Sequence, residues 1–211
     1  MSHHVALLGD SIFDNGAYTR GELDVIHHFR ALLPPDWKAT LAAVDGSTTA
    51  DLKGQLVALP QGVTRAVLSV GGNDAILNAD ILNRPVASTR EALLLFGARV
   101  SAFESAYRTA LDAVVARLPA LTVCTIYNGN LGPEEAQEAR VALMLFNDVI
   151  LRAAFERGLD VIDLRLVCTE PDDYANPIEP SGLGGRKIAA AIASSLGIAR
   201  ETLRRTMTYA R

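Results

Sequence analysis

The stretch that decides the fold is Val5-Ala6-Leu7-Leu8-Gly9-Asp10-Ser11-Ile12, close to the amino terminus. Its first four residues form an apolar run without strict alternation, which is typical of a strand covered on both faces, as in a parallel sheet. A glycine, an aspartate and a serine follow at once, and these residue types favour a turn. The stretch therefore predicts a buried parallel strand that ends in a tight turn carrying a hydroxyl group.

Four further short apolar runs follow along the chain. They are Ala39–Val44, Ala66–Val70, Leu121–Ile126 and Val161–Leu164. The intervals between runs carry apolar residues three or four positions apart, which indicates amphipathic helices. The helical positions are Leu93, Phe96, Val100, Phe103, Tyr107, Leu111, Val114 and Leu118; Val141, Leu145, Val149 and Ala153, flanked by Phe146 and Ile150; and Ile188, Ala191 and Ile192. The segment Ala199–Arg211 is a candidate for an additional basic helix.

Strands that alternate with helices predict right-handed βαβ units. We therefore expect an α/β protein with three αβα layers around a flavodoxin-like, doubly wound, parallel sheet of five strands. The chain has 211 residues, of which 49% are hydrophobic and 21% charged, and no Pro- or Ser-rich linker divides it. Length and composition are those of one soluble globular domain, which we place at residues 1–211.

Charge and hydropathy narrow the range of partners. The formal net charge of −4 argues against nucleic acid, because proteins that bind it usually carry a basic face. No segment approaches the roughly 18 apolar residues of a membrane helix, and the amino terminus lacks the features of a signal peptide. Cys124 and Cys168 lie in or beside apolar runs and are expected to be small buried hydrophobes. We expect a cytoplasmic protein with no membrane partner; its oligomeric state is not predicted.

Ligands of doubly wound sheets bind beyond the carboxyl ends of the strands, so the residues after each run are the candidates for chemistry. Those residues are Gly9-Asp10-Ser11-Ile12, Asp45-Gly46-Ser47-Thr48-Thr49 and Gly71-Gly72-Asn73-Asp74. They supply a hydroxyl, a glycine amide and a side-chain amide, which are the groups that acyl transfer requires. Taken singly, each piece also fits a helix cap or a turn, and the three aspartates could in principle hold a divalent cation.

These blocks together resemble the characteristic blocks of the SGNH/GDSL hydrolases. Gly9-Asp10-Ser11-Ile12 is similar to the GDS(L/I) block, Gly46 to the glycine of the second block, and Gly71-Gly72-Asn73-Asp74 to the GxND block. The resemblance implies a serine esterase or acyl hydrolase with Ser11 as the nucleophile. It also implies an oxyanion hole made by the backbone N–H groups of Ser11 and Gly46 and the side-chain amide of Asn73, with no metal or organic cofactor.

The last block of that family, Asp-x-x-His, is replaced in this chain. Asn176 stands at the aspartate position and Glu179 at the histidine position, and no histidine follows His28. In one interpretation Glu179 is the general base, and the Asn176 side-chain amide donates a hydrogen bond that orients its carboxylate. Donor and acceptor would then be exchanged relative to the Asp–His pair of the family. A carboxylate of ordinary pKa, about 4.3, is a weak base, so burial would have to raise that pKa.

Other interpretations remain open at this point. Asp172 and Asp173 are further candidates for a carboxylate near Ser11. The glycine-rich stretch Ser181–Gly185 lacks the lysine spacing of a Walker phosphate loop and the glycine spacing of a dinucleotide-binding fingerprint. It therefore predicts the start of a helix. Residues Ile76, Leu77, Ile81 and Leu82 could wall a substrate pocket or pack as a short helix.

The sequence thus predicts an acyl hydrolase that acts on a small ester or an O-acylated substrate. The alternative is a catalytically impaired ligand-binding protein of the same fold. A flavodoxin-like nucleotide binder is disfavoured, because the first strand–helix turn has no glycine-rich phosphate loop.

Overall fold

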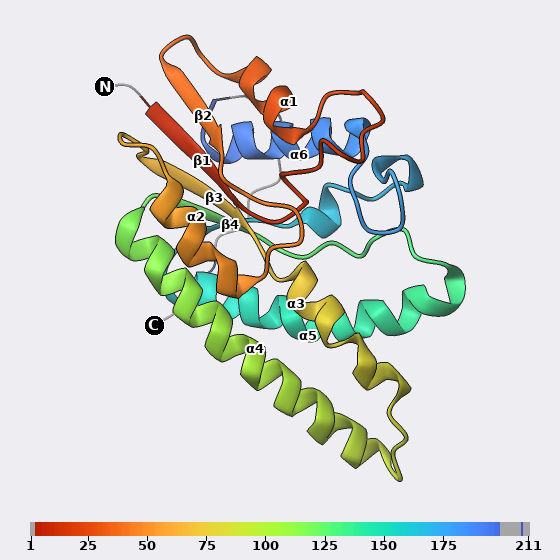
Figure 1. Cartoon of the computed structure of the whole chain (residues 1–211). Helices are drawn as coiled ribbons and strands as arrows, with labels where there is room; N and C mark the ends of the chain where they lie inside the picture. Colours follow the sequence, from red (N-terminus) through yellow and green to blue (C-terminus); the bar gives the residue numbers. More distant parts are fainter. Residues whose placement is uncertain (1–2, 199–207, 209–211) are drawn as a thin grey trace.

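The computed structural model describes residues 3–198 and Thr208 (Figure 1). The basic helix suggested for Ala199–Arg211 therefore lies outside the described residues, apart from Thr208. Five strands of the described part of the chain form one all-parallel sheet in the order β2-β1-β3-β4-β5. The strands are β1 (His3–Gly9), β2 (Trp37–Leu41), β3 (Arg65–Ser69), β4 (Leu121–Cys124) and β5 (Asp160–Ile162). This is the doubly wound order expected from the sequence, and the predicted fold class is confirmed.

The described residues form six α-helices, of which five cover the two faces of the sheet while α3 lies at its carboxyl edge (Figure 1). They are α1 (Val25–Leu32), α2 (Leu52–Ala58), α3 (Gly72–Leu77), α4 (Thr89–Arg117), α5 (Pro133–Glu156) and α6 (Gly182–Ser195). Helices α1 and α6 pack together on one face, and α2, α4 and α5 on the other. The strand residues divide accordingly: Val5 and Leu7 point into the α1/α6 core, and Ala6 and Leu8 into the opposite one.

The second strand differs from its expected range. The apolar run Ala39–Val44 extends past the end of the strand at Leu41. Both Ala42 N and Ala43 N donate to the carbonyl of Leu7, so the chain bends away from β1 at this point. The bend carries the following residues, including Gly46, out of the sheet and across its carboxyl edge.

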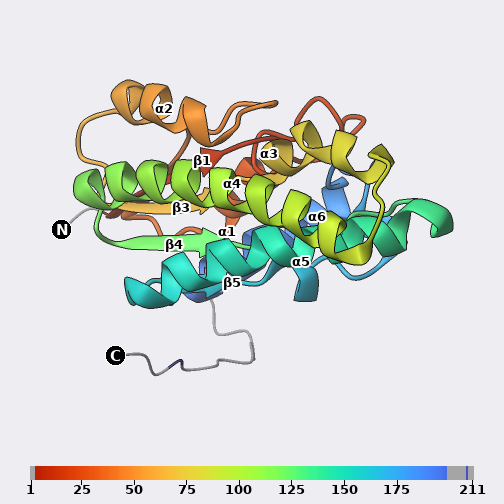
Figure 2. The ribbon, with the colours of Figure 1, turned by 90° about the horizontal axis from the view of Figure 1, so that it is seen from below.

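The long helices extend beyond the sheet. Phe103, Tyr107, Leu111 and Val114 of α4 are buried as the spacing predicts, but Leu93 is 66% exposed. The apolar stripe of α5 behaves in the same way: Val149 and Ala153 are buried, whereas Val141 and Leu145 are exposed. The amino-terminal halves of both helices continue past the ends of the strands, so part of each apolar stripe lies outside the core (Figures 1 and 2).

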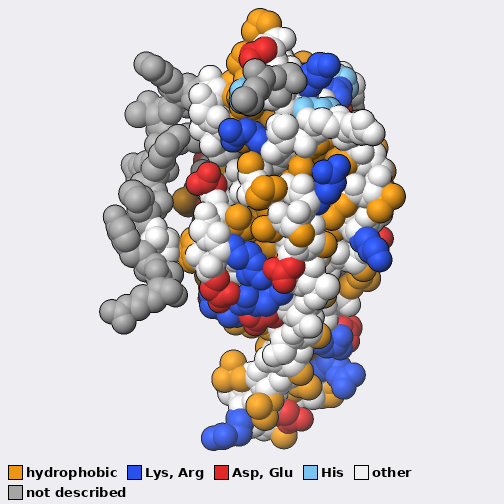
Figure 3. All heavy atoms as spheres, turned by 90° about the vertical axis from the view of Figure 1, so that its left-hand side faces the viewer, with side chains coloured by type: hydrophobic (Ala, Val, Ile, Leu, Met, Phe, Trp, Pro, Cys, Tyr) orange, Lys and Arg blue, Asp and Glu red, His pale blue; other side chains and the backbone are white. Residues whose placement is uncertain are grey.

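Charged side chains join α4 to α5 along their packed halves. Glu104 pairs with both Arg108 and Arg152, and Arg108 also pairs with Glu156. Acidic and basic side chains gather in a patch on this side of the molecule (Figure 3). None of the helices in the described part of the chain is long and apolar enough to cross a membrane.

Candidate active site

Ser11 lies on the turn that follows β1, at the carboxyl edge of the sheet. Gly9 adopts a φ of +125°, and a Cβ built on it would lie 1.7 Å from the Ser69 carbonyl oxygen. Only glycine allows β1 and β3 to approach so closely here. Asp10 N then donates to that carbonyl at 3.1 Å, and the Asp10 carboxylate accepts from Ile12 N at 3.1 Å. These contacts fix the turn and hold Ser11 at the edge.

The Ser11 hydroxyl donates to the carboxylate of Glu179, with 3.1 Å between Oγ and Oε1. The two residues are 168 positions apart in the sequence. Glu179 is 6% exposed, and its Oε2 is buried with no hydrogen-bond partner among the described residues. Burial raises the pKa of Glu179 to about 7, the hydrogen bond from Ser11 opposes this rise, and the negative charge of Asp45 adds to it. A carboxyl group with a nearly neutral pKa thus contacts the hydroxyl that the sequence singled out.

Asn176 acts on Glu179 through the backbone. Its Oδ1 accepts from Ile178 N at 2.9 Å and from Glu179 N at 2.8 Å, and the Ala175 amide donates to the Glu179 carbonyl at 2.8 Å. The expected hydrogen bond from the Asn176 amide to the Glu179 carboxylate is not made within the described residues. Asn176 therefore shapes the loop as an Asx turn, because its short side chain reaches the backbone of its own loop before the carboxylate.

Tyr127, which the sequence analysis missed, also holds this loop. It follows β4, and its hydroxyl donates to the Ile178 carbonyl, one residue before Glu179. Nearby, Asn130 N donates to the Pro177 carbonyl at 2.8 Å. Its position directly after the fourth apolar run marked Tyr127 as a residue at the carboxyl edge of the sheet, but no motif in the sequence linked it to the Glu179 loop.

The other end of the loop is anchored to α1 and α6. Fully buried Asn15 donates to the Pro180 carbonyl at 3.1 Å and accepts from Val25 N at 3.0 Å. Buried Asp173 forms an ion pair with Lys187 at 2.6 Å, so this aspartate is engaged away from Ser11. The stretch Ser181–Gly185 begins α6, as expected, with Ser181 Oγ capping Gly184 N.

Two of the three expected oxyanion donors, Gly46 and Asn73, lie on the turn after β2 and in the first turn of α3. One N–H of the Asn73 side-chain amide donates to the Ser47 carbonyl at 2.9 Å, and this bond fixes the orientation of the amide. The second N–H of the same amide takes no part in that bond. Gly46, one residue earlier, is exposed and has a φ of +78°. Neither Ser11 N nor Gly46 N donates to any acceptor within residues 3–198. Asp74 joins the two turns by accepting from the amide and the hydroxyl of Thr49.

A second buried carboxyl lies beside Ser11. Asp10 is 3% exposed, and burial raises its pKa to about 7. Its hydrogen bond from Ile12 opposes that rise, and the charges of Glu179 and Asp74 add to it. No group of three or more metal-ligating side chains occurs in the described part of the chain, so Asp10, Asp45 and Asp74 are not gathered as a cation site there.

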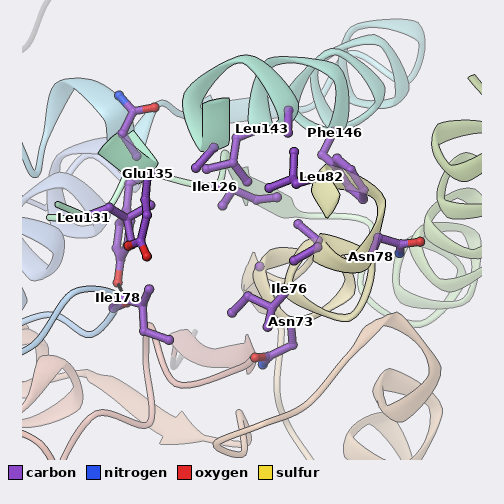
Figure 4. A pocket seen from close by; sticks show the side chains of 18 of the residues that line it. Asn73, Ile76, Asn78, Leu82, Ile126, Leu131, Glu135, Leu143, Phe146 and Ile178 are labelled. Carbon is purple, nitrogen blue, oxygen red and sulfur yellow. Dashed lines mark hydrogen bonds between the residues drawn. The ribbon is translucent and has the colours of Figure 1, made fainter. Parts of the chain in front are cut away.

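A cavity of about 460 Å³ opens beside Ser11 and Glu179. Figure 4 shows side chains that line it, among them Asn73, Ile76 and Phe146. Asp10 and Asn73 also line it. Its apolar walls come from α3, the 3₁₀ helix η2 (Ala79–Asn83), the loop after β4 and the projecting halves of α4 and α5. The apolar lining includes Ile76, Ile81, Leu82, Phe96, Ile126, Leu131, Leu143, Phe146 and Ile178. The sequence suggested that Ile76, Leu77, Ile81 and Leu82 wall a substrate pocket or pack as a short helix. Three of them, Ile76, Ile81 and Leu82, line the cavity, and Leu77 does not.

The fold and the site define a doubly wound α/β protein with a hydroxyl–carboxylate pair at the carboxyl edge of its sheet. The model of the GDSL-like lipase/acylhydrolase family matches residues 7–186. The chain therefore belongs to the GDSL-like lipase/acylhydrolase family.

Solved structures of similar fold include three enzymes. An extracellular lipase from Streptomyces rimosus is 18% identical with a TM-score of 0.68, covering 92% of this chain and 99% of the other. A phospholipase A1 from Streptomyces albidoflavus is 18% identical with a TM-score of 0.67 and the same coverage. The acetylxylan esterase Axe2 from Geobacillus stearothermophilus is 18% identical with a TM-score of 0.68, covering 97% of both chains. At this identity the likeness shows the fold alone. A comparison with curated protein sequences gives no match.

Proposed function

We propose that this protein is a serine acyl hydrolase in which Glu179 performs the proton transfers assigned to histidine in its family. The observation that carries the proposal is the buried 3.1 Å hydrogen bond from Ser11 Oγ to Glu179 Oε1, beside a largely apolar cavity that both residues line. A hydroxyl is a weak nucleophile until a neighbouring base accepts its proton. A carboxylate whose pKa is about 7 is a far better acceptor than one of ordinary pKa, and near neutral pH much of it is still ionised.

The reaction would run in two steps, and in each step Glu179 accepts a proton from the attacking oxygen and gives it to the leaving oxygen. Ser11 Oγ attacks the ester carbonyl carbon while its proton passes to Glu179 Oε1. The tetrahedral intermediate then collapses, the alcohol leaves with that proton, and an acyl-Ser11 ester remains. A water molecule attacks this ester, gives one proton to Glu179, and the acid is released as the proton returns to Ser11 Oγ.

The negative charge on the attacked carbonyl oxygen needs hydrogen-bond donors. We assign this role to the backbone amides of Ser11 and Gly46 and to the Asn73 side chain. Support comes from the two amides, which have no acceptor among the described residues, and from the tether between Asn73 and Ser47. A donor whose orientation is fixed before the reaction stabilises the transition state without the cost of reorganisation.

The cavity indicates where the acyl group of the substrate lies. Most of the lining surface is apolar and comes from Ile, Leu, Phe and Ala side chains, while Asn78, Arg99, Glu135 and Glu138 also line the cavity. An apolar acyl chain fits the apolar part of this wall. We therefore propose an ester whose acyl part is apolar. The small ester or O-acylated substrate expected from the sequence is compatible with this cavity.

Labelling by a fluorophosphonate probe, together with hydrolysis of p-nitrophenyl esters, tests the proposal. Wild type is expected to be labelled and to hydrolyse the ester, and Ser11→Ala is expected to do neither. A matched control is Ser101→Ala, which removes an exposed hydroxyl from α4 and is expected to behave as wild type. If wild type and Ser11→Ala give the same signals, the hydrolase proposal is wrong and the ligand-binding alternative takes its place.

A further inference from the structure

The cavity has a polar end as well as an apolar wall. Figure 4 shows Asn78 on the side of the pocket opposite Ile178, with Ile76 between them. Ile178 precedes Glu179, which bonds Ser11, so we call the side at Ile178 the reactive end and the side at Asn78 the polar end. An acyl group on Ser11 that extends along the apolar wall therefore ends beside Asn78.

Helix α5 runs along the cavity in the same direction. Glu135 lies near the start of the helix, on the side of Ile178, and Phe146, about three turns later, lies on the side of Asn78 (Figure 4). Glu138 lies about one turn after Glu135 and also lines the cavity. The acidic side chains that α5 contributes to the wall therefore border the reactive end and not the polar end.

Arg99 of α4 is the charged side chain at the polar end. Its guanidinium group donates to Asn78 Oδ1 at 3.1 Å and to the Asp80 carboxylate at 2.9 Å. Its other N–H groups have no acceptor among the described residues, and the side chain is 42% exposed, so water can reach them. An alkyl group laid over this guanidinium would displace water without supplying an acceptor, which costs free energy.

We propose that the hydrated charge of Arg99 ends the acyl-binding part of the cavity and limits the acyl chain to about six carbons. The proposal rests on the proposed function. From Asn73 to Asn78 the chain advances about 7.5 Å along α3, and an extended chain advances about 1.2 Å per bond. Carbons within this length leave water for contact with Ile76 and its apolar neighbours, whereas later carbons would cover the guanidinium.

Binding of straight-chain 1-alkanols to Ser11→Ala tests the limit in the absence of chemistry. Isothermal titration calorimetry is expected to show an affinity that rises about fourfold per methylene and stops rising near hexanol. Arg99→Leu in the same background continues the apolar wall, so the rise is expected to extend to octanol or beyond. Arg99→Lys keeps the charge but cannot donate to both Asn78 and Asp80 as a planar fork does, and it is expected to keep the limit near hexanol.

Arg90→Leu is the matched control, because it makes the same change at an exposed position of α4 outside the cavity lining. It is expected to leave the limit unchanged. An affinity that rises without a break to dodecanol, or a limit that stays at hexanol in Arg99→Leu, would refute the proposal. So would an equal shift in Arg90→Leu or Arg99→Lys, and so would the absence of any alkanol binding.

Hydrolysis of p-nitrophenyl esters of the same chain lengths separates this proposal from the proposed function. In wild type, kcat/KM is expected to stop rising at the hexanoate, and in Arg99→Leu at a longer chain. Hydrolysis with one chain-length profile in both proteins would refute the limit and leave the hydrolase standing. A limit in alkanol binding that Arg99→Leu shifts, together with no ester hydrolysis by wild type, would refute the hydrolase and leave the limit standing.

Discussion

Replacing Glu179 by glutamine is expected to lower activity and to raise the free energy of unfolding, relative to that of wild type, as the pH rises from about 4.5 to about 8.5. The carboxyl group is buried, and its pKa rises from 4.5 to about 7 on folding. At about 1.4 kcal/mol per pH unit, ionisation of Glu179 costs the folded state about 3 kcal/mol. This cost depends on pH, because Glu179 loses its proton at a higher pH in the folded state than in the unfolded state. Below the unfolded pKa both states are protonated and there is no cost. The cost then grows as pH rises towards 7 and is constant above it.

The side chain introduced by Glu179→Gln carries no charge, so the variant escapes this cost. Its amide nitrogen can still be left without a partner where Glu179 Oε2 is buried, which would cost about 1–3 kcal/mol at every pH. The pH dependence is therefore the informative quantity. The free energy of unfolding of Glu179→Gln minus that of wild type is expected to rise by about 3 kcal/mol between about pH 4.5 and about pH 8.5.

Urea unfolding at the two pH values measures this difference, and ester hydrolysis measures the activity. Loss of the general base is expected to lower kcat by about 10²–10⁴-fold. Asp172→Asn provides the matched control, because it removes an exposed carboxylate from the same loop, in the 3₁₀ helix η4 (Pro171–Asp173). It is expected to change neither quantity. A stability difference that does not vary with pH, or normal activity in Glu179→Gln, would refute the reasoning.

Three further predictions concern the site and its support. The kcat/KM of wild type is expected to rise with pH to a plateau through a midpoint of about 7, because only ionised Glu179 accepts the Ser11 proton; a midpoint between about 4 and 5 in the pH–rate profile would contradict this. Asn73→Ala is expected to lower kcat by about 10²–10³-fold with little change in KM, since an oxyanion donor acts in the transition state; steady-state kinetics showing a change in KM alone would exclude that role. Gly184→Ala is expected to cost about 1–3 kcal/mol in urea unfolding, because a Cβ there lies 2.1 Å from the Asp173 carbonyl oxygen. Its control, Gly97→Ala, lies in an exposed part of α4 with nothing within 4 Å of the added Cβ and is expected to be neutral or slightly stabilising.

The fold could be predicted because its determinants are local. Each strand is a short apolar run, and turn residues such as Gly9 and Gly71 stand where the runs end. Periodicity also located the buried halves of α4 and α5. It could not show that Leu93 and Val141 are exposed, because a helical stripe contains no information on how far its helix extends beyond the sheet.

The site could be predicted in part. The contact between Ser11 and Glu179 follows once the register of the last block is known. The role of Asn176 could not be derived, because the backbone of its own loop decides which atoms its side chain reaches. Tyr127 carries no motif, and its contact with the Ile178 carbonyl depends on the position of a loop 51 residues away.

A carboxylate can take over the work of an imidazole only if its environment changes its basicity. In water a glutamate is a weak base at neutral pH, and a hydrogen bond from a serine lowers its pKa further. Here burial outweighs that hydrogen bond, and Asp45 contributes its negative charge. The loop keeps Glu179 in place through the Asn176 turn and the Tyr127 hydroxyl, neither of which contacts the carboxylate oxygens. Because Oε2 has no partner among the described residues, the carboxylate gains no second stabilising contact there that would lower its pKa again. The burial that makes ionised Glu179 destabilise the fold is the same burial that makes its carboxylate a better base. A substitution that removes the cost of ionisation is therefore expected to remove the proton acceptor as well.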